Sequence, residues 1–249
     1  MNVDKIVFLG NSHIQGVGSE WPRMYKDLVA MPQELKQNLW TNYIRTTIDS
    51  PAVIQAKFKE LLTRVKINPK LVQKYRDEAC FPALIARHYK KEYINLGFES
   101  YNFYQIAARL LVTYPSFENS LVILGVPPLV NDLLYHNPAG SQKFENVTIP
   151  NAASTLILIK EFVEGRGGKF VYFHVEDYPE EFYSVKNNPF LYHLEDCKLF
   201  DFSLFELSTP SIVKKKMDGI HFDHTGHKFL ATKFIEEFEN TLIFSILSS

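Results

Sequence analysis

The 249-residue chain has only two cysteines, Cys80 and Cys197, and almost no excess of charge of either sign. Two thiols are too few for a disulfide framework or a thiolate zinc site, so we expect both to be buried in a reduced protein. With 27 Lys and Arg residues against 28 Asp and Glu residues, the chain has no general attraction for nucleic acid or an anionic membrane. The composition therefore gives no reason to expect a nucleic-acid partner.

Long hydrophobic runs are also missing. The N-terminal segment has four consecutive apolar residues after an acid and a base, fewer than a secretory signal peptide requires. The late stretch TLIFSILSS is shorter than the roughly 20 apolar residues that span a bilayer. We therefore expect a cytoplasmic protein with no membrane span. No repeat, low-complexity tract or Gly/Ser/Pro-rich linker divides the chain, which predicts a single domain over residues 1–249.

Short apolar runs rich in Val, Ile and Phe alternate with longer stretches of helical spacing. The apolar runs predict buried strands at residues 5–10, 92–97, 120–126, 168–175 and 198–203. Helical spacing occupies residues 104–114, 151–165 and 224–246. Strands that alternate with helices predict an α/β fold, in which helices cover both faces of a parallel sheet.

Residues 21 to about 80 interrupt this alternation. They contain helical stretches at 50–67 and 69–79 and no convincing strand. We expect a mainly helical insertion after the first strand, folded over one end of the sheet. Its aromatic residues could line a pocket for sugar or acyl groups, although packing against the sheet is the commoner fate of such side chains; they are Trp21, Tyr25, Trp40 and Tyr43.

Ser12 follows the first predicted strand, where function collects in a parallel sheet. A serine hydroxyl becomes a useful nucleophile only when a base takes its proton and a third group holds that base. Asp218 precedes His221 by three residues near the other end of the chain, a spacing that can place a carboxylate beside the imidazole. We predict that His221 accepts the Ser12 proton and that Asp218 orients the ring. Helix capping by Ser12, and Asp223 as a rival carboxylate, remain open.

Two sequence blocks, Gly10-Asn11-Ser12 and Asp218-Gly219-Ile220-His221, resemble the first and last blocks of the SGNH hydrolases, also called GDSL esterases and lipases. A third, EYINLGFESYNFYQIAARL at residues 92–110, resembles a block in which an asparagine ends a strand and a turn follows. The resemblance implies a flavodoxin-like three-layer fold. It also implies attack on a carboxylic ester by Ser12 through an acyl-enzyme, with no metal or organic cofactor.

In that family the oxyanion hole is built from the N–H of the nucleophile, a glycine N–H and an asparagine side chain. Counted from Asn95, the glycine position falls on Ser100, and the nearest actual glycine is Gly97. A serine keeps a backbone N–H, so the resemblance implies donors at Ser12 and Ser100, with Gly97 as the alternative.

The asparagine position is less regular. Strict spacing places Pro127 where the family has its asparagine, and proline has no amide side chain. Asn131 restores an Asn-Asp pair four residues later and is our expected donor. Asn137 is the fallback, and simple helix capping by Asn131 is nearly as good an explanation.

The remaining histidines have simpler interpretations. His13 follows the nucleophile directly, and because adjacent side chains diverge we expect it to be a bystander. His224 and His227 continue a three-residue spacing from His221, but no acidic cluster accompanies them, so we do not expect a metal site.

The predicted function is hydrolysis of a carboxylic ester, with an O-acetylated carbohydrate or another short acyl ester as the preferred substrate. Acyl transfer by the same triad is an alternative. A second alternative is a catalytically impaired protein with a binding or structural role, because Ser100 and Pro127 stand at two oxyanion positions. The oligomeric state is not predicted.

Overall fold

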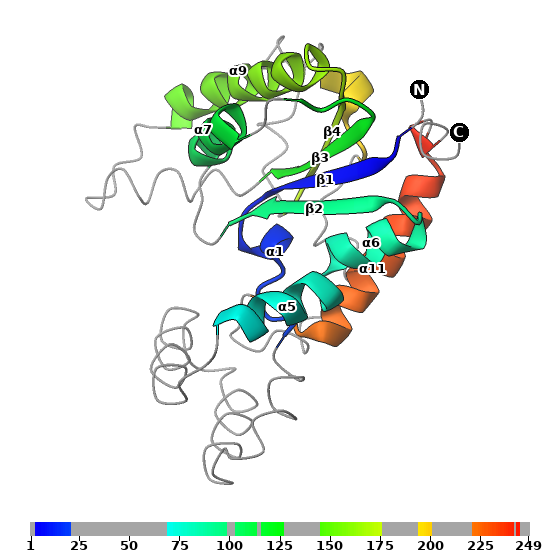
Figure 1. The fold of residues 1–249 in the computed structure, drawn as a ribbon. Coiled ribbons are helices and arrows are strands. Elements are labelled where there is room, and N and C mark those ends of the chain that lie inside the picture. Colours follow the sequence, from blue (N-terminus) through cyan, green and yellow to red (C-terminus); the bar gives the residue numbers. More distant parts are fainter. Residues whose placement is uncertain are drawn as a thin grey trace, which may run out of the picture.

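The computed structural model describes residues 3–20, 69–98, 103–113, 116–126, 145–175, 194–200, 221–241 and 243–244. Its centre is a four-stranded sheet in the order β2-β1-β3-β4 (Figure 1). The strands are β1 (Lys5–Gly10), β2 (Glu92–Gly97), β3 (Ser120–Val126) and β4 (Lys169–His174). Every neighbouring pair is parallel. The sheet and its flavodoxin-like order agree with the predicted fold class.

Helices cover both faces of the sheet (Figure 1). One side carries α5 (Pro69–Ala79), α6 (Phe81–His88) and α11 (His224–Glu239). The other side carries α7 (Phe103–Thr113) and α9 (Glu145–Glu164). Within the described ranges, no helix combines the length and the apolar character that a bilayer crossing demands.

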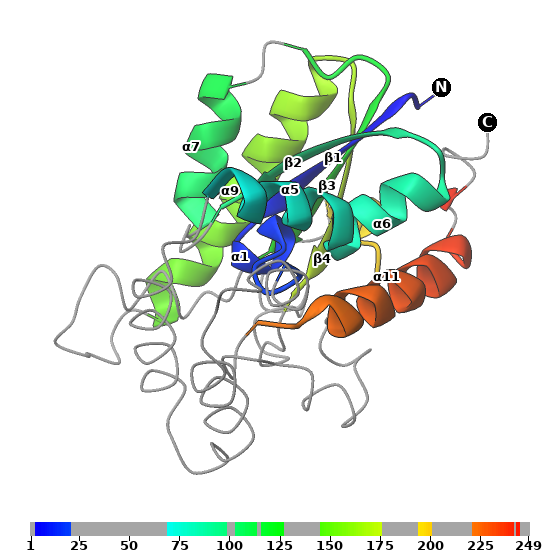
Figure 2. The same cartoon turned by 60° about the horizontal axis from the view of Figure 1, so that its bottom comes forward.

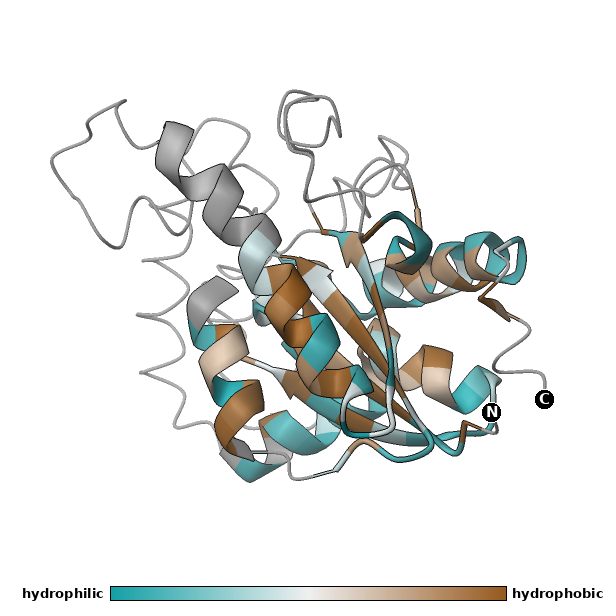
Figure 3. Ribbon diagram, turned by 90° about the horizontal axis from the view of Figure 1, so that it is seen from above, coloured by the Kyte–Doolittle hydropathy of each residue, from teal (hydrophilic) through white to brown (hydrophobic). Residues whose placement is uncertain are grey.

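Successive residues of β1 serve opposite faces of the sheet. Ile6 and Phe8 join the apolar cluster that includes α6 and α11 residues, whereas Val7 and Leu9 join the cluster under α7 and α9. All four side chains are at most 1% exposed. The central strand is therefore apolar on both faces. Burial of each such side chain stabilises the folded state by about 1.5–3 kcal/mol. In Figure 3 the strands are largely hydrophobic, whereas the helices alternate between hydrophobic and hydrophilic segments.

The fifth predicted strand, at 198–203, is described only as far as residue 200, where it makes a single parallel bridge and not a full strand. Lys198 forms one isolated parallel bridge with Tyr172, and the Leu199 N–H donates to the Tyr172 carbonyl at 2.8 Å. A short 3₁₀ turn ends immediately before this point, and the Lys198 N–H turns back to the Glu195 carbonyl. The segment touches the edge of β4 without extending into a described strand.

Several helix boundaries also differ from the prediction. The sequence pattern did not reveal α6, which has eight residues and a proline in its first turn. α9 begins six residues before the predicted 151. α11 ends at Glu239 rather than near 246, because the Asn240 side chain donates to the Glu236 carbonyl and closes the last turn. Within the predicted insertion, α5 is helical as expected, and residues 21–68 lie outside the described ranges.

Candidate active site

The turn after β1 presents Ser12 at the start of a very short helix, α1 (Ser12–Gln15), which lies at the carboxyl end of β1 (Figure 2). The Asn11 side chain caps this helix by accepting a hydrogen bond from the His13 N–H at 3.1 Å. The helix ends at Gly16, whose φ of 89° lies in the left-handed region that favours glycine. Asn11 is therefore the capping residue, which leaves the Ser12 hydroxyl for other contacts.

β2 braces α1 through the side chain of Asn95. Its Nδ2 donates to the Ile14 carbonyl at 2.9 Å and to the Tyr93 hydroxyl at 2.7 Å, while its Oδ1 accepts from the Gly97 N–H at 2.8 Å. A Cβ at residue 97 would clash with the backbone of Gln15, so the strand end and the helix approach closely only because glycine stands there.

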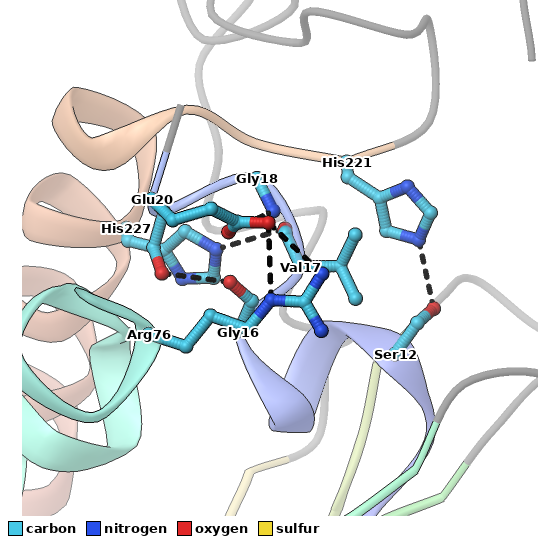
Figure 4. Close-up of polar contacts among 9 residues, drawn as sticks. Ser12, Gly16, Val17, Gly18, Glu20, Arg76, His221 and His227 are labelled. Atoms are coloured by element: carbon cyan, nitrogen blue, oxygen red, sulfur yellow. Dashed lines mark hydrogen bonds and ion pairs between the residues drawn. The ribbon is translucent and has the colours of Figure 1, made fainter. Parts of the chain in front are cut away.

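The Ser12 hydroxyl and the His221 ring meet, although they are 209 residues apart in the chain. The distance from Ser12 Oγ to His221 Nε2 is 2.8 Å (Figure 4). His221 is buried, with 6% of its surface exposed, and it lies in the segment just before α11. This is hydrogen-bonding reach for proton transfer between a hydroxyl and an imidazole.

Asp223 fixes the segment that carries His221. Its Oδ1 accepts from the backbone N–H groups of Thr225 and Gly226, at 2.9 and 2.8 Å, and from the Thr225 hydroxyl at 2.6 Å. These contacts make Asp223 the N-cap of α11. The carboxylate considered as a rival orienting group is thus engaged in ending the loop and starting the helix.

The His13 side chain packs beside the proposed base, a contact that the expected bystander role did not include. Its side chain is 4% exposed, and its ring lies against the His221 ring with centroids 5.2 Å apart. It also lies beside Phe222, at 6.2 Å between ring centroids. Adjacent side chains diverge from α1, but the 221–222 segment passes over the helix and meets His13 directly.

The structure gives His227 two backbone partners, namely the Phe81 N–H at Nδ1 and the Val17 carbonyl at Nε2. With both ring nitrogens so occupied, His227 is not placed to bind a metal. Among the described residues, no three His, Cys, Asp or Glu side chains gather as metal ligands.

A buried ion pair lies beside these residues and was not anticipated from the sequence (Figure 4). Arg76 on α5 donates to Glu20 Oε1 through Nε at 3.0 Å and Nη2 at 2.9 Å. The second carboxylate oxygen of Glu20 accepts from the Gly18 N–H at 2.9 Å. Glu20 and Arg76 are 2% and 11% exposed, so the pair ties α5 to the turn after α1.

Both cysteines are free thiols and buried, as expected. Cys80 Sγ lies 3.2 Å from the Tyr93 hydroxyl, which also accepts a hydrogen bond from Asn95. Burial raises the pKa of the Cys80 thiol to about 11 and that of Cys197 to about 12. Neither thiol has the low pKa that a nucleophilic cysteine requires.

The other predicted site residues divide into two groups. Gly97 is described, and its N–H is already donated to Asn95, which argues against the alternative that it serves the oxyanion. The rest lie outside the described residues: Ser100, Pro127, Asn131, Asn137 and Asp218.

No protein-family model and no curated protein matches the sequence. The structure is similar to a carbohydrate esterase whose active site displays divergent catalytic and non-catalytic binding functions, with 11% identity and a TM-score of 0.53 over 97% of this chain and 70% of that one. An α/β hydrolase enzyme from the metagenome of Lake Arreo, Spain, matches with 11% identity and a TM-score of 0.50 over 100% of this chain and 99% of that one.

A GDSL-like lipase from Parabacteroides merdae is similar with 13% identity and a TM-score of 0.50, over 96% of this chain and 97% of that one. The chain therefore has the α/β fold of the SGNH, or GDSL, hydrolases. Fold alone does not define activity, which depends on the residues of the site.

Proposed function

We propose that this protein is a serine esterase of the SGNH type. The observation that carries the proposal is the 2.8 Å contact between Ser12 Oγ and His221 Nε2. In an α/β fold of this kind, a serine after the first strand and an imidazole before the last helix have few structural reasons to form a partly buried hydrogen bond. Proton transfer between them supplies a functional one.

Hydrolysis follows in two halves. His221 Nε2 takes the Ser12 proton as Oγ attacks the ester carbonyl carbon; the tetrahedral intermediate collapses, and His221 returns the proton to the departing alcohol. His221 then takes a proton from water as the water oxygen attacks the acyl-enzyme carbonyl. The second tetrahedral intermediate collapses, His221 returns that proton to Ser12 Oγ as the ester bond to Ser12 breaks, and the carboxylic acid leaves. Asp218 is proposed to orient His221, and the Ser12 and Ser100 N–H groups with the Asn131 amide to bind the oxyanion.

A short acyl ester, such as an O-acetyl group on a carbohydrate, is the proposed substrate. The support is the fold shared with a carbohydrate esterase, although at 11% identity. An alcohol that replaces water in the second half would make the same residues an acyltransferase.

A fluorophosphonate probe tests the proposal directly, because it reacts with a serine that an adjacent base activates. We expect the wild-type protein to be labelled and Ser12→Ala and His221→Gln to be spared, while all three stay folded by circular dichroism. The wild-type protein should also hydrolyse an aryl acetate and acetylated sugars, and neither variant should do so. A folded wild-type protein that reacts with neither the probe nor any ester would contradict the esterase.

A non-catalytic binding role is the second candidate. It is favoured by Pro127, which stands where the family has an amide donor, and by the non-catalytic binding functions reported for the similar carbohydrate esterase. Under this alternative, Ser12→Ala binds an acetylated sugar as tightly as the wild type and neither protein turns it over.

A further inference from the structure

His227 joins three segments of the chain from a fully enclosed position, with 1% of its surface exposed. Nδ1 accepts a hydrogen bond from the Phe81 N–H at 3.2 Å, at the start of α6. Nε2 donates to the Val17 carbonyl at 3.4 Å, in the turn after α1 (Figure 4). The ring also stacks on Phe81, with centroids 5.9 Å apart and planes 15° from parallel. One side chain of α11 therefore contacts both α6 and the nucleophile turn.

The two backbone groups nearest His227 are coupled to the reacting pair. On the α1 side, the Val17 N–H donates to the Ser12 carbonyl at 3.1 Å, so Val17 and Ser12 share one tight turn. On the α11 side, the His227 N–H donates to the Asp223 carbonyl at 2.9 Å, and Asp223 caps the helix two residues after His221. A shift of His227 relative to Val17 would thus move the His221 ring relative to the Ser12 hydroxyl.

We propose that His227 is a positioning residue for the Ser12–His221 pair, which holds α11 against the nucleophile turn at the separation that the 2.8 Å contact requires. This proposal rests on the proposed esterase function. It assigns His227 no contact with the substrate.

The contacts of His227 require an uncharged ring, because one nitrogen accepts a hydrogen bond while the other donates one. Burial is the main reason that the pKa of His227 is lowered to about 3. Positive charge on His13, on His221 or on Arg76 lowers it further, and these groups approach the ring from α1, from the segment before α11 and from α5. The ring therefore stays neutral at the pH where an esterase of this type works.

Two replacements separate this role from simple core filling. His227→Phe keeps an aromatic ring of similar size but leaves the Phe81 N–H and the Val17 carbonyl without partners. His227→Gln keeps one acceptor and one donor. The matched control is Val163→Ala on α9, a fully buried residue on the opposite face of the sheet, which costs stability without touching the site.

The test measures the second-order rate of fluorophosphonate labelling, and kcat and KM for an aryl acetate, at a temperature where all variants are folded. His227→Phe should be labelled about tenfold more slowly, with kcat reduced equally and KM within about twofold, because misplacement of the reacting groups costs rate rather than binding. His227→Gln should recover most of the loss, and Val163→Ala should react like the wild type.

Three outcomes overturn the positioning role: wild-type labelling of His227→Phe, equal losses in the Gln and Phe variants, or a loss as large in Val163→Ala. Should His227→Phe not fold, His227→Met makes the same comparison with a flexible apolar side chain. Failure of the esterase itself looks different, because the wild-type protein is then unlabelled; in that case both proposals fall together.

Discussion

The imidazole rings of His13 and His221 lie 5.2 Å apart between centroids, with their planes tilted by 43°. His13 is the neighbour of Ser12 in sequence, so the residue after the proposed nucleophile supports the proposed base. Phe222 also lies near His13, with ring centroids 6.2 Å apart. The site is therefore packed as well as hydrogen-bonded.

Removal of the His13 ring should loosen His221 without removing any proposed catalytic group. We expect His13→Ala to lower the rate of fluorophosphonate labelling about fivefold or more. A gap beside His221 would let its ring rotate away from the Ser12 hydroxyl and weaken their hydrogen bond. His13→Phe, which refills the space, should keep most of the wild-type rate. Equal rates for His13→Ala and the wild type would show that the ring contact is incidental.

The Glu20–Arg76 pair should be costly to break from one side. Arg76→Met leaves the Glu20 carboxylate, 2% exposed, without its cation, and the free energy of unfolding should fall by about 3–5 kcal/mol. The double variant with Glu20→Gln should lose less than the sum of the two single losses. Urea unfolding of the four proteins measures this coupling, and strictly additive losses would mean that the two groups act independently.

The brace from β2 to α1 should depend on the amide of Asn95. Asn95→Asp keeps the shape but replaces the Nδ2 donor that holds the Ile14 carbonyl and the Tyr93 hydroxyl, so we expect a loss of about 2–4 kcal/mol in unfolding free energy. Tyr93→Phe removes the contact to Cys80 and the acceptor of one of the Asn95 hydrogen bonds but leaves the bond to the Ile14 carbonyl, and it should cost about 1–2 kcal/mol. A smaller loss for Asn95→Asp than for Tyr93→Phe would contradict this account.

Stability should fall as the pH decreases below the usual histidine pKa of about 6.5. Burial lowers the pKa of both His227 and His174 to about 3 in the folded protein. Between these values the unfolded chain binds protons that the folded chain does not, so each residue removes about 1.4 kcal/mol of stability per pH unit. Above pH 6.5 both states are neutral and the effect vanishes.

The measurement is urea unfolding at several pH values from 7 to about 4. The difference in unfolding free energy between the wild type and His227→Gln reports the contribution of His227 alone, because the carboxylates titrate in both proteins and cancel. The variant should show a shallower loss on the acid side, and parallel curves would mean that His227 is protonated in the folded state.

Neither cysteine should react in the folded protein. Cys80 and Cys197 are 0% and 3% exposed, and burial raises the pKa of each thiol, to about 11 and about 12. We expect a disulfide reagent at pH 8 to modify no thiol in buffer and two in urea. Fast modification of one thiol without denaturant would contradict this prediction and would show that the segment around that cysteine unfolds locally.

Much of the fold could be predicted because the parallel strands are buried on both faces. β1 and β3 contain uninterrupted runs of Val, Ile, Leu and Phe, β2 is a shorter and less apolar stretch, and the observed limits of all three strands equal the predicted ones. α6 was not predicted, because eight residues that include a proline show little of the hydrophobic periodicity of a helix. The stretch at 198–203 has strand composition, but the preceding turn commits the Lys198 N–H elsewhere, which composition does not reveal.

The site was predictable where chemistry restricts the choice of residues. A serine nucleophile needs an imidazole, so Ser12 and His221 could be paired from opposite ends of the chain. The supporting contacts could not be found in this way. Glu20 and Arg76 are 56 residues apart in ordinary charged surroundings, and only the docking of α5 brings them together.

The position of β1 between β2 and β3 has a consequence for synthesis on the ribosome. Lys5 pairs with Glu92 on one side and with Ser120 on the other, so β1 must wait for two strands that follow it in the chain. One edge of β1 can be covered once β2 has been synthesised, and the other edge stays open until β3 follows. The sheet therefore cannot close around β1 until β3 is available, and such long-range parallel pairing is intrinsically slow to form.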